Sequence, residues 1–419
     1  MKKYKLGDIA TVEISGVDKK ITDGEKEIRL CNFVDVYYNW AITIAQHDSF
    51  MLATARPNEI SKFQLKKGQV ALTKDSETRD DIGISTYIAD DFEDVILGYH
   101  CALISPNKDI LDGRYLNALL HTNYAKKYFA CNASGSGQRY ALSVEALNSF
   151  PVPIIPLHEQ KQIGEIFSAL DKKIELNRQI NQNLEAMAKQ LYDYWFVQFD
   201  FPNEEGKPYK SSGSKMVWNE KLKREIPQGW NNGMLIDIAN ITMGQSPDGS
   251  SYNEVGEGML FYQGSTDFGM RFPSVRQYTT APSRYAKRGD ILMSVRAPVG
   301  SINIANNDCC IGRGLSAINS KLGSTTHLYY ILNDLRIAFE QRNAAGTTFG
   351  SITKEDLYSL PIIIPSHEVI RAFDKICSPM FDRQMILGEE IDNLIKQRDE
   401  LLPLLMNGQV SVNSDLSLD

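Results

Sequence analysis

A proline-rich stretch occurs twice in this chain and decides the fold. Residues 150–159 read FPVPIIPLHE, and residues 360–368 read LPIIIPSHE. Each copy is followed by a long stretch with apolar residues at the steps of three, four or seven that are typical of a helix packed on another helix. A unit repeated over half of the chain predicts approximate two-fold symmetry within one polypeptide. We therefore expect two globular domains, each followed by a long helix.

Shorter motifs repeat in the same order and place strands and loops. Residues 6–12 (LGDIATV) match 235–241 (LIDIANI), and residues 65–73 (LKKGQVALT) match 286–294 (AKRGDILMS). In the second pair a basic glycine turn enters a β-rich run, which predicts a turn followed by a strand. Each unit ends near a glycine-rich loop, at 133–139 and 344–350. We expect a mixed α+β domain twice, with a helix over 113–130 and its counterpart over 325–342.

The two long helices carry apolar stripes that need a partner helix. The first stripe contains Ile163, Leu170, Leu184 and Leu191, and the second has Phe373, Met380, Leu387, Leu394 and Leu401 at intervals of seven. We expect the two helices to pack antiparallel on each other and to hold the two domains at opposite ends. Pro379 should break or kink the second helix, and Pro403 should disturb its last turn.

These patterns divide the chain into six predicted segments. The first domain covers 1–156, a first spacer helix 157–200, a linker 201–227, the second domain 228–365, a second spacer helix 366–410 and a tail 411–419.

Composition and charge are ordinary for a folded protein. The chain has 419 residues, 42% hydrophobic and 23% charged, with a net charge of −7. No apolar run reaches the length of a membrane span, and the N-terminus does not resemble a secretion signal. The six cysteines include no CxxC pair, so we interpret them as reduced thiols of a cytoplasmic protein. The excess acid lies in the spacers and linker, which leaves the two domains close to neutral and able to bind DNA through a local basic face.

Catalytic motifs are missing from the sequence. It contains no GxxxxGK[ST] phosphate loop, no GxSxG, no HExxH and no Asn-Pro-Pro-Tyr run of the kind that amino-methyltransferases use. His158-Glu159 and His367-Glu368 recur, but both pairs fall in a predicted first helical turn, where a carboxylate complements the helix dipole. The sequence therefore favours a binding or scaffolding protein over an enzyme.

Four groups of residues resemble the specificity subunits of Type I restriction-modification systems. They are 156–163 (PLHEQKQI) with 170–177 (LDKKIELN), 195–202 (WFVQFDFP) with the linker after it, 243–247 (MGQSP) with 289–300 (GDILMSVRAPVG), and the repeated motif at Pro365. The resemblance covers nearly the whole chain. It implies an α+β fold with two target-recognition domains in pseudo-two-fold arrangement, separated by two long antiparallel coiled-coil helices.

The same resemblance implies the partners. Each domain would read one half of a split sequence in double-stranded DNA. The helices would dock two methyltransferase (M) subunits, and restriction/translocase (R) subunits would complete the complex. No cofactor is then expected on this chain, because S-adenosylmethionine belongs to the methyltransferase partner and ATP and Mg to the nuclease partner.

Residues with base-edge or phosphate chemistry in the predicted loops are the candidates for DNA contact. In the first domain they are Lys74, Thr78, Arg79, Gln138, Arg139 and Tyr140; in the second they are Gln263, Asp267, Arg271, Arg276, Arg284, Arg296, Arg313, Thr347 and Thr348. Each could instead be an ordinary surface or turn residue. Tyr37, Tyr38 and Trp40 could stack on a flipped base, although core packing is the commoner role of such a cluster.

Candidate contacts with the methyltransferase are the apolar positions of the two helices, Ile163, Leu170, Leu184, Leu191, Leu387, Leu394 and Leu401. One alternative from a different class is a coiled-coil scaffold that binds proteins and has no DNA specificity. Another is a relative of enzymes that fuse nuclease, methyltransferase and recognition domains, which the missing catalytic motifs disfavour.

Overall fold

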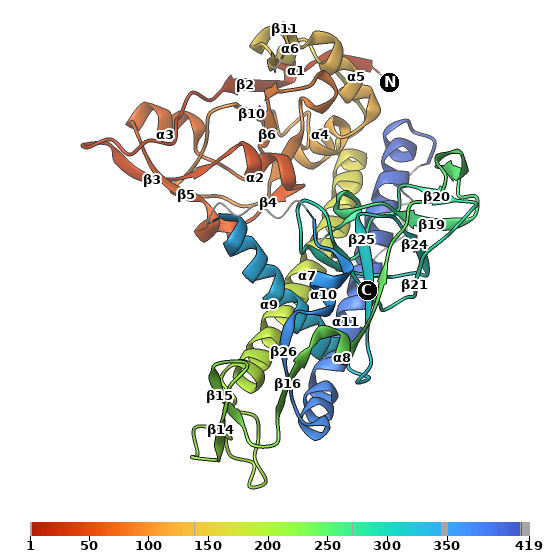
Figure 1. Ribbon diagram of the computed structural model, residues 1–419. Coiled ribbons are helices and arrows are strands. Elements are labelled where there is room, and N and C mark those ends of the chain that lie inside the picture. The colour runs from red at the N-terminus through yellow and green to blue at the C-terminus, as the bar shows by residue number, and fades with distance from the viewer. Residues whose placement is uncertain (1, 138, 270, 345–350, 411, 413–419) are drawn as a thin grey trace. The chain divides into compact units, whose positions relative to one another are not determined.

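The computed structural model describes residues 2–137, 139–269, 271–344, 351–410 and 412, and it divides into two compact units (Figure 1). The first unit contains Met1–Leu176 and Asp392–Asp419, and the second contains Asn177–Ile391. Two long helices, α7 (Leu157–Tyr192) and α11 (His367–Met406), contribute to both units. Each unit therefore consists of one globular domain and a part of each helix.

The globular domain of the first unit is a mixed α+β structure. Its main sheet has the order β2-β10-β6-β8-β4, formed by Ala10–Ile14, Cys101–Pro106, Val70–Thr73, Ser85–Ile88 and Ala41–Ile42. A smaller sheet has the order β5-β3-β9, formed by Met51–Ala55, Lys26–Cys31 and Val95–Leu97. The ends of the domain meet where β1 (Lys2–Lys5) pairs antiparallel with β13 (Pro151–Ile154). Its helices are α1 (Leu6–Ile9), α2 (Phe33–Tyr38), α3 (Pro57–Phe63), α4 (Gly113–Leu120), α5 (Asn123–Asn132) and α6 (Val144–Asn148).

The second unit has the same plan. Its main sheet has the order β17-β25-β22-β23, formed by Ala239–Met243, Leu315–Ser320, Ile291–Ser294 and Ile302–Ile304. Its other large sheet has the order β18-β20-β19-β24-β21, formed by Tyr252–Asn253, Tyr278–Thr279, Met259–Tyr262, Cys309–Ile311 and Tyr285–Ala286. Strand β16 (Asn231–Met234) pairs with β26 (Pro361–Ile364), and β14 (Met216–Asn219) pairs with β15 (Arg224–Pro227) in the linker. The helices of this domain are α8 (Leu235–Ile238), α9 (Thr325–Ala344) and α10 (Lys354–Tyr358).

The duplication in the sequence is a duplication of structure. The strand order β2-β10-β6-β8 of the first domain returns as β17-β25-β22-β23 in the second. The repeated proline-rich motif forms β13 and β26, each paired with the first strand of its own domain. The two glycine turns precede β6 and β22, and Gly68 and Gly289 both have a positive φ, of 96° and 91°. The predicted turn-and-strand repeat is confirmed.

Two predictions about helices are wrong. The segment expected as one helix over 113–130 is two helices, because the Thr122 hydroxyl accepts a hydrogen bond from Ala125 N (3.3 Å) and caps a new start. The counterpart over 325–342 is one helix, α9, as predicted. Helix α11 continues through both Pro379 and Pro403, so the predicted break is wrong, whereas the predicted kink at Pro379 stays a prediction. An interior proline costs about 3 kcal/mol, but Cys377 and Phe381 on either side of Pro379 are buried in the core and hold the helix.

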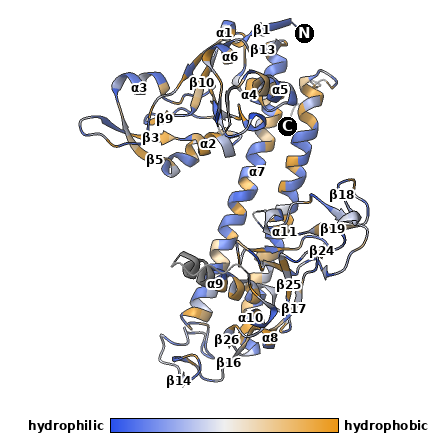
Figure 2. Ribbon diagram, turned by 45° about the horizontal axis from the view of Figure 1, so that its top comes forward, coloured by the Kyte–Doolittle hydropathy of each residue, from blue (hydrophilic) through white to orange (hydrophobic). Residues whose placement is uncertain are grey.

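Both helices belong to the cores of the domains. In the first unit the start of α7 (Ile163, Phe167) and the end of α11 (Leu402, Leu405) share one hydrophobic cluster with the domain. In the second unit the end of α7 and the start of α11 do the same, through Tyr192 and Phe373. This pairing of start with end is antiparallel, as predicted. Apolar and polar residues alternate along both helices (Figure 2), which matches burial of one face of each.

The buried imidazole of His327, in α9, makes the second unit sensitive to acid. The side chain is 2% exposed and its ring centre lies 4.6 Å from that of Phe196. Burial lowers its pKa to about 3 from the ordinary 6.5. The unfolded chain therefore takes up the proton first, so that stability is complete above pH 6.5 and is lost as the pH falls from there towards 3.

His327→Leu is expected to reduce this loss. Since one pKa unit corresponds to about 1.4 kcal/mol, the variant should lose about 2 kcal/mol less than the parent chain between pH 7 and pH 5. Urea unfolding followed by tryptophan fluorescence at the two pH values measures the difference. His158→Gln is the control, because the His158 side chain is 75% exposed. Equal acid sensitivity of His327→Leu and the parent chain would contradict the assignment.

Candidate nucleic-acid interface

A buried carboxylate gathers three basic side chains in the first unit. Asp75 lies in β7 (Asp75–Ser76), with Lys74 Nζ 2.8 Å and Arg139 Nη2 3.6 Å from its carboxylate, and His100 Nδ1 is hydrogen-bonded to the same oxygen. Burial by itself raises the pKa of Asp75, but the hydrogen bonds from Lys74 and His100 outweigh burial and keep that pKa below its ordinary value. The carboxylate is therefore ionised at neutral pH and fixes the basic side chains around it.

Strand pairing brings the predicted residues of this cluster together from two distant parts of the sequence. Strand β7 pairs with β12 (Arg139–Ala141), which pairs with β11 (Ser134–Ser136). The Arg79 guanidinium lies 5.0 Å from the centre of the Tyr140 ring. The glycine-rich segment thus carries a hairpin, and it places Arg139 and Tyr140 beside Lys74 and Arg79.

These side chains differ in how available they are to a ligand. Thr78 and Arg79 are exposed, and the Arg139 side chain is 63% exposed. The Lys74 side chain is only 13% exposed and is held by Asp75. An exposed guanidinium can contact either a phosphate or the major-groove edge of guanine. Arg79 and Arg139 are therefore the candidates of this cluster whose side chains are most accessible to DNA.

The second unit presents three exposed arginines on chain segments that backbone hydrogen bonds join to one another. We call these joined segments the backbone frame. Arg284, Arg296 and Arg313 are exposed, and within the described residues none of them is paired with a carboxylate. Ile311 N donates to Arg284 O (2.9 Å), which joins the segments that carry Arg284 and Arg313. Arg296 forms an antiparallel bridge with Ser351.

Glycines let the segments of this frame approach closely. A Cβ on Gly244 would lie 2.2 Å from the Gly312 carbonyl oxygen, so the MGQSP motif needs glycine at that position. Arg313 N donates to Ser246 Oγ at 3.3 Å, and Val295 N donates to Gly314 O at 2.9 Å. The motif quoted from the sequence therefore supports the backbone on which Arg313 and Arg296 stand.

The same frame exists in the first unit. Lys74 N donates to His100 O (2.9 Å), and the equivalent bond in the second unit runs from Val295 N to Gly314 O. Leu142 N donates to Lys74 O (2.8 Å), and the equivalent bond runs from Ile352 N to Val295 O (2.9 Å). In the same way Asn32 N donates to Asp35 Oδ2 (2.7 Å), and Gln263 N donates to Asp267 Oδ2 (2.8 Å).

Sequence reasoning missed four residues of the first unit that this correspondence reveals. Asn32 stands where Gln263 stands in the second unit, Tyr99 stands where Arg313 does, and Asp75 and His100 complete the basic cluster. Tyr99 is 43% exposed. The sequence does contain a signal for these positions, because Gly98 and Gly312 are equivalent glycines that each follow a buried strand of the repeat.

The pair Asp267 and Arg276 is committed to the domain itself. Arg276 Nε lies 2.9 Å and Nη2 2.5 Å from Asp267 Oδ1, and the Asp267 side chain is 6% exposed. The Gln263 side chain is exposed beside this pair. The carboxylate of Asp267 thus holds the loop, while the outer face of Arg276, 61% exposed, remains open.

Other candidates lie away from these frames or outside the described residues. The Arg271 side chain is 8% exposed and forms an ion pair with Glu185 of α7 at 2.8 Å. Trp40 stacks on His121 with ring centres 4.3 Å apart, which is the packing role foreseen for the aromatic cluster, and Tyr37 donates to Asp81. Tyr38 is 74% exposed. Gln138, Thr347 and Thr348 lie outside the described residues.

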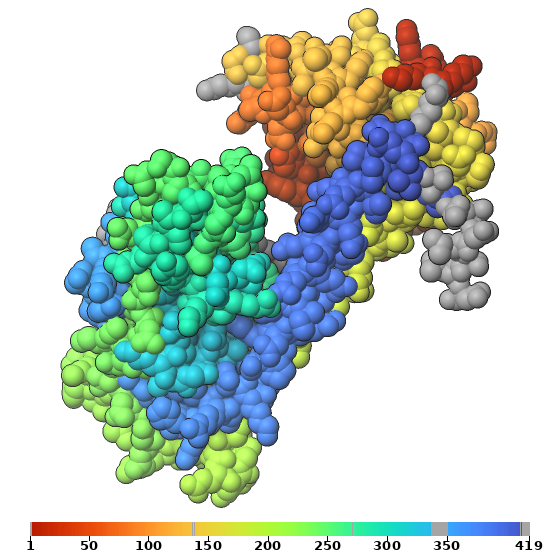
Figure 3. All heavy atoms as spheres, turned by 90° about the vertical axis from the view of Figure 1, so that its right-hand side faces the viewer, coloured from red at the N-terminus to blue at the C-terminus, as the bar shows by residue number. Residues whose placement is uncertain are grey.

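The predicted docking positions line the inner faces of the helices. Ile163 and Leu387 are buried, whereas Leu170, Leu184, Leu191, Leu394 and Leu401 are half-buried. Much of the surface of α11 is visible on one face of the molecule (Figure 3). The apolar side chains exposed on the helices are different ones: Leu176 and Leu404 in the first unit, and Met187, Ile376 and Ile386 in the second.

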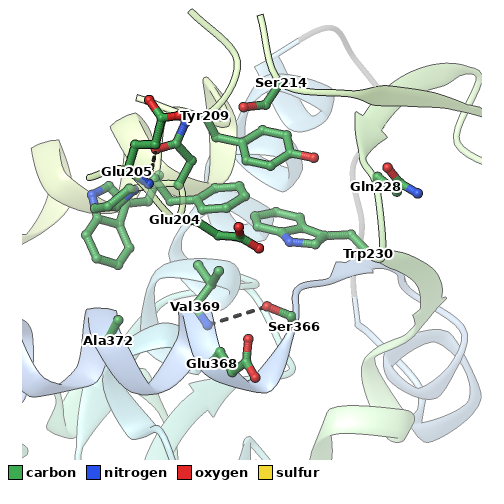
Figure 4. Close-up of a pocket in the computed structure, with 14 residues that line it drawn as sticks. Glu204, Glu205, Tyr209, Ser214, Gln228, Trp230, Ser366, Glu368, Val369 and Ala372 are labelled. Carbon is green, nitrogen blue, oxygen red and sulfur yellow. Dashed lines mark hydrogen bonds between the residues drawn. The ribbon is translucent and has the colours of Figure 1, made fainter. Parts of the chain in front are cut away.

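The linker builds a pocket of about 700 Å³ in the second unit (Figure 4). The aromatic side chains of Phe201, Tyr209 and Trp230 line it. The carboxylates of Glu204 and Glu368 line it as well (Figure 4). Phe201 stacks between Tyr209 and Trp230 at 4.6 and 5.0 Å between ring centres. This stack folds the polar linker onto the core of the second unit.

The described residues contain no group of three or more His, Cys, Asp or Glu side chains placed to hold a metal ion. No helix among them combines the length and apolar character that crossing a membrane requires.

The chain has two domains that repeat the same frame with exposed basic side chains, and each domain packs on both antiparallel helices. This arrangement is that of a modular recognition protein. A family model described as "Type I restriction modification DNA specificity domain" matches residues 1–186 and 227–397. The chain belongs to this family of sequence-specific DNA-recognition subunits.

Individual relatives agree with the family. The chain is 32% identical over 370 residues to a Methanocaldococcus jannaschii protein assigned as the specificity subunit of the type I restriction enzyme MjaX, covering 86% of this chain and 82% of that protein. It is 25% identical over 408 residues to the HindI specificity subunit of Haemophilus influenzae, covering 84% and 88%. The crystal structure of a type I S subunit from M. genitalium has the same fold, with a TM-score of 0.60 at 15% identity over 96% of this chain and 95% of that one.

Proposed function

We propose that this chain is the non-catalytic recognition subunit of a Type I methyltransferase and endonuclease complex, and that it reads a bipartite DNA target with the two frames described above. The observation that carries the proposal is the repetition of one hydrogen-bond frame in both units, each with exposed side chains that can contact DNA. In the first unit these are Arg79, Arg139 and Tyr99, and in the second they are Arg284, Arg296, Arg313 and Gln263.

Direct reading of bases requires side chains that can reach the major groove, and arginine offers a bidentate contact to guanine O6 and N7. Gln263 and Asn32 have the amide group that pairs with the N6 and N7 edge of adenine. Two such frames in one chain would read two half-sites of one duplex. Phosphate contacts by the remaining cations would add affinity that falls with salt concentration.

Partners supply the chemistry in this proposal. Two methyltransferase subunits dock on the helices, bind S-adenosylmethionine and modify adenine, and restriction subunits use ATP and Mg. This chain itself carries no cofactor. The complex acts in the cytoplasm, where the DNA is. The exposed apolar residues of α7 and α11 support docking there, because an apolar side chain left at the surface of a helix gains stability when a partner covers it.

Methylation sequencing of the native host's DNA, with and without the gene for this chain, tests the function. Loss of modified adenine from one split motif on deletion is the expected result, and it gives both half-sites at once. An unchanged methylation pattern in cells that express the methyltransferase would instead support the protein-binding scaffold, which family membership does not favour.

A further inference from the structure

We propose that Arg271 and Phe272 lock the second recognition domain onto α7 and α11 in one orientation, and so act as positioning residues that fix the distance at which the second half-site is read. The proposal rests on the DNA-recognition function of the family. It assigns to Arg271 a role in orienting the domain in place of a contact with DNA.

The loop that carries these residues is fastened to the main sheet of the domain. Ile304 N, at the end of β23, donates to Arg271 O at 2.9 Å. Asn303 Nδ2 donates to Gly269 O at 3.1 Å, and Phe268 forms an antiparallel bridge with Pro273. A movement of the sheet therefore carries Arg271 and Phe272 with it.

Arg271 reaches three helices from this loop. Its Nη1 lies 2.8 Å from Glu185 Oε2 of α7, and its guanidinium lies 5.2 Å from the ring centre of Tyr329 on α9 and 4.3 Å from that of Phe381 on α11. The Arg271 side chain is 8% exposed. Separating this pair is costly on the arginine side, because the buried Arg271 guanidinium would be left without its carboxylate.

The carboxylate that receives Arg271 also joins the two long helices to each other. Gln384 Nε2 of α11 donates to Glu185 Oε2 at 3.2 Å and to Asn181 O at 3.1 Å. Gln384 is 1% exposed and Asn181 is 4% exposed, so this polar contact lies inside the seam between the helices. The buried Gln384 Nε2 favours one register of the two helices, because any other register would take this donor away from both of its acceptors.

Phe272 fits a notch in α11 that glycine creates. A Cβ on Gly388 would lie 1.9 Å from Phe272 Cε2, a distance that real side chains do not reach. Phe272 is 8% exposed and belongs to the core of the second unit. Rotation of the domain along the helix would thus separate Arg271 from Glu185 and push Phe272 against the helix backbone.

This lock has a consequence for DNA. Successive base pairs are about 3.4 Å apart, so a tilt that moves the reading face by a few ångströms shifts the preferred half-site by one base pair. A domain fixed at two points accepts one spacing of half-sites, whereas a loosened domain accepts neighbouring spacings.

The test uses the full chain in complex with its methyltransferase subunits and a DNA library in which the two half-sites are separated by different gaps. We compare Arg271→Met, which keeps the length of the side chain but removes its charge, with Arg271→Lys and with Gly388→Ala. Alanine favours a helix over glycine, so Gly388→Ala does not weaken α11 itself. Lys287→Met, which removes an exposed charge of the same domain, is the matched control.

The expected result is a rise of at least about tenfold in methylation at gaps one base pair longer or shorter, relative to the native gap, for Arg271→Met and for Gly388→Ala. The recognised bases stay the same, Arg271→Lys keeps most of the native preference, and Lys287→Met matches the parent chain. A changed base preference at the native gap would show that Arg271 contacts DNA and would overturn the proposal. Loss of methylation at every gap by a folded variant assembled with its methyltransferase would also overturn it. An unchanged gap preference in folded variants overturns it as well. Absence of any split motif for the parent complex would instead count against the proposed function.

Discussion

Replacement of Arg296 by alanine is expected to weaken binding of the recognised DNA by about 1–3 kcal/mol, the range for loss of one bidentate contact. Arg296 is exposed, and the backbone next to it is fixed on both sides, since Val295 N donates to Gly314 O and Ile352 N donates to Val295 O, both at 2.9 Å. A side chain on so fixed a backbone loses little conformational freedom on binding, which favours a strong contact. Fluorescence polarisation with a labelled duplex, at constant salt, measures the loss.

The salt dependence separates two kinds of contact. If Arg296 contacts a base, the loss appears with the recognised sequence and is small with an unrelated duplex. If it contacts a phosphate, both duplexes lose affinity and the slope of log K against log salt falls by about one. Lys287→Ala, at an exposed lysine of the same domain, is the control. Normal affinity of a normally melting Arg296→Ala protein would remove Arg296 from the interface.

Repetition made most of the architecture predictable from the sequence. The two proline-rich motifs, the two glycine turns and the antiparallel helices appear in the structure as expected, because each rests on local backbone chemistry or on a long apolar period. The helix interruption at Thr122 was missed because the apolar periodicity continues across it, and only the capping contact with Ala125 shows the new start. The continuity of α11 at Pro379 was missed because its support comes from tertiary packing.

The site was predictable only in part. The predicted residues Lys74, Arg79, Arg139 and Tyr140 come from two separate segments of the sequence, and strand pairing brings them together. Asp75, which organises them, gave no signal, because a carboxylate in a charged loop normally faces solvent. Arg271 shows the opposite case. Its residue type suggests DNA, but its contact with Glu185 depends on how the domain packs on α7, which no local pattern encodes.

The largest effect on assembly is expected from the exposed apolar residue Ile386 of α11. Ile386 is 54% exposed in this chain, as is Met187 of α7. Covering an isoleucine side chain with a partner contributes about 1.5–3 kcal/mol, and an aspartate in its place would bury a charge. Ile386→Asp should therefore weaken binding of the methyltransferase subunit by at least about 3 kcal/mol, which is about a hundredfold in Kd. Surface plasmon resonance with the immobilised full chain measures it.

This test needs exposed positions, because a substitution at a buried position of the helix cannot distinguish loss of a methyltransferase contact from loss of packing within this chain. Leu387, the neighbour of Ile386, is 0% exposed. An aspartate there would disrupt the packing of this chain, so that loss of the methyltransferase would follow whether or not Leu387 touched it. Ile386→Asp leaves the buried side chains in place, and Gln397→Asp introduces the same residue at an exposed polar position of the same helix as a control. If Ile386→Asp and Met187→Asp both bind the methyltransferase as the parent chain does, neither residue belongs to the docking face. Ile376 of the second unit, and Leu176 and Leu404 of the first, then become the positions to replace.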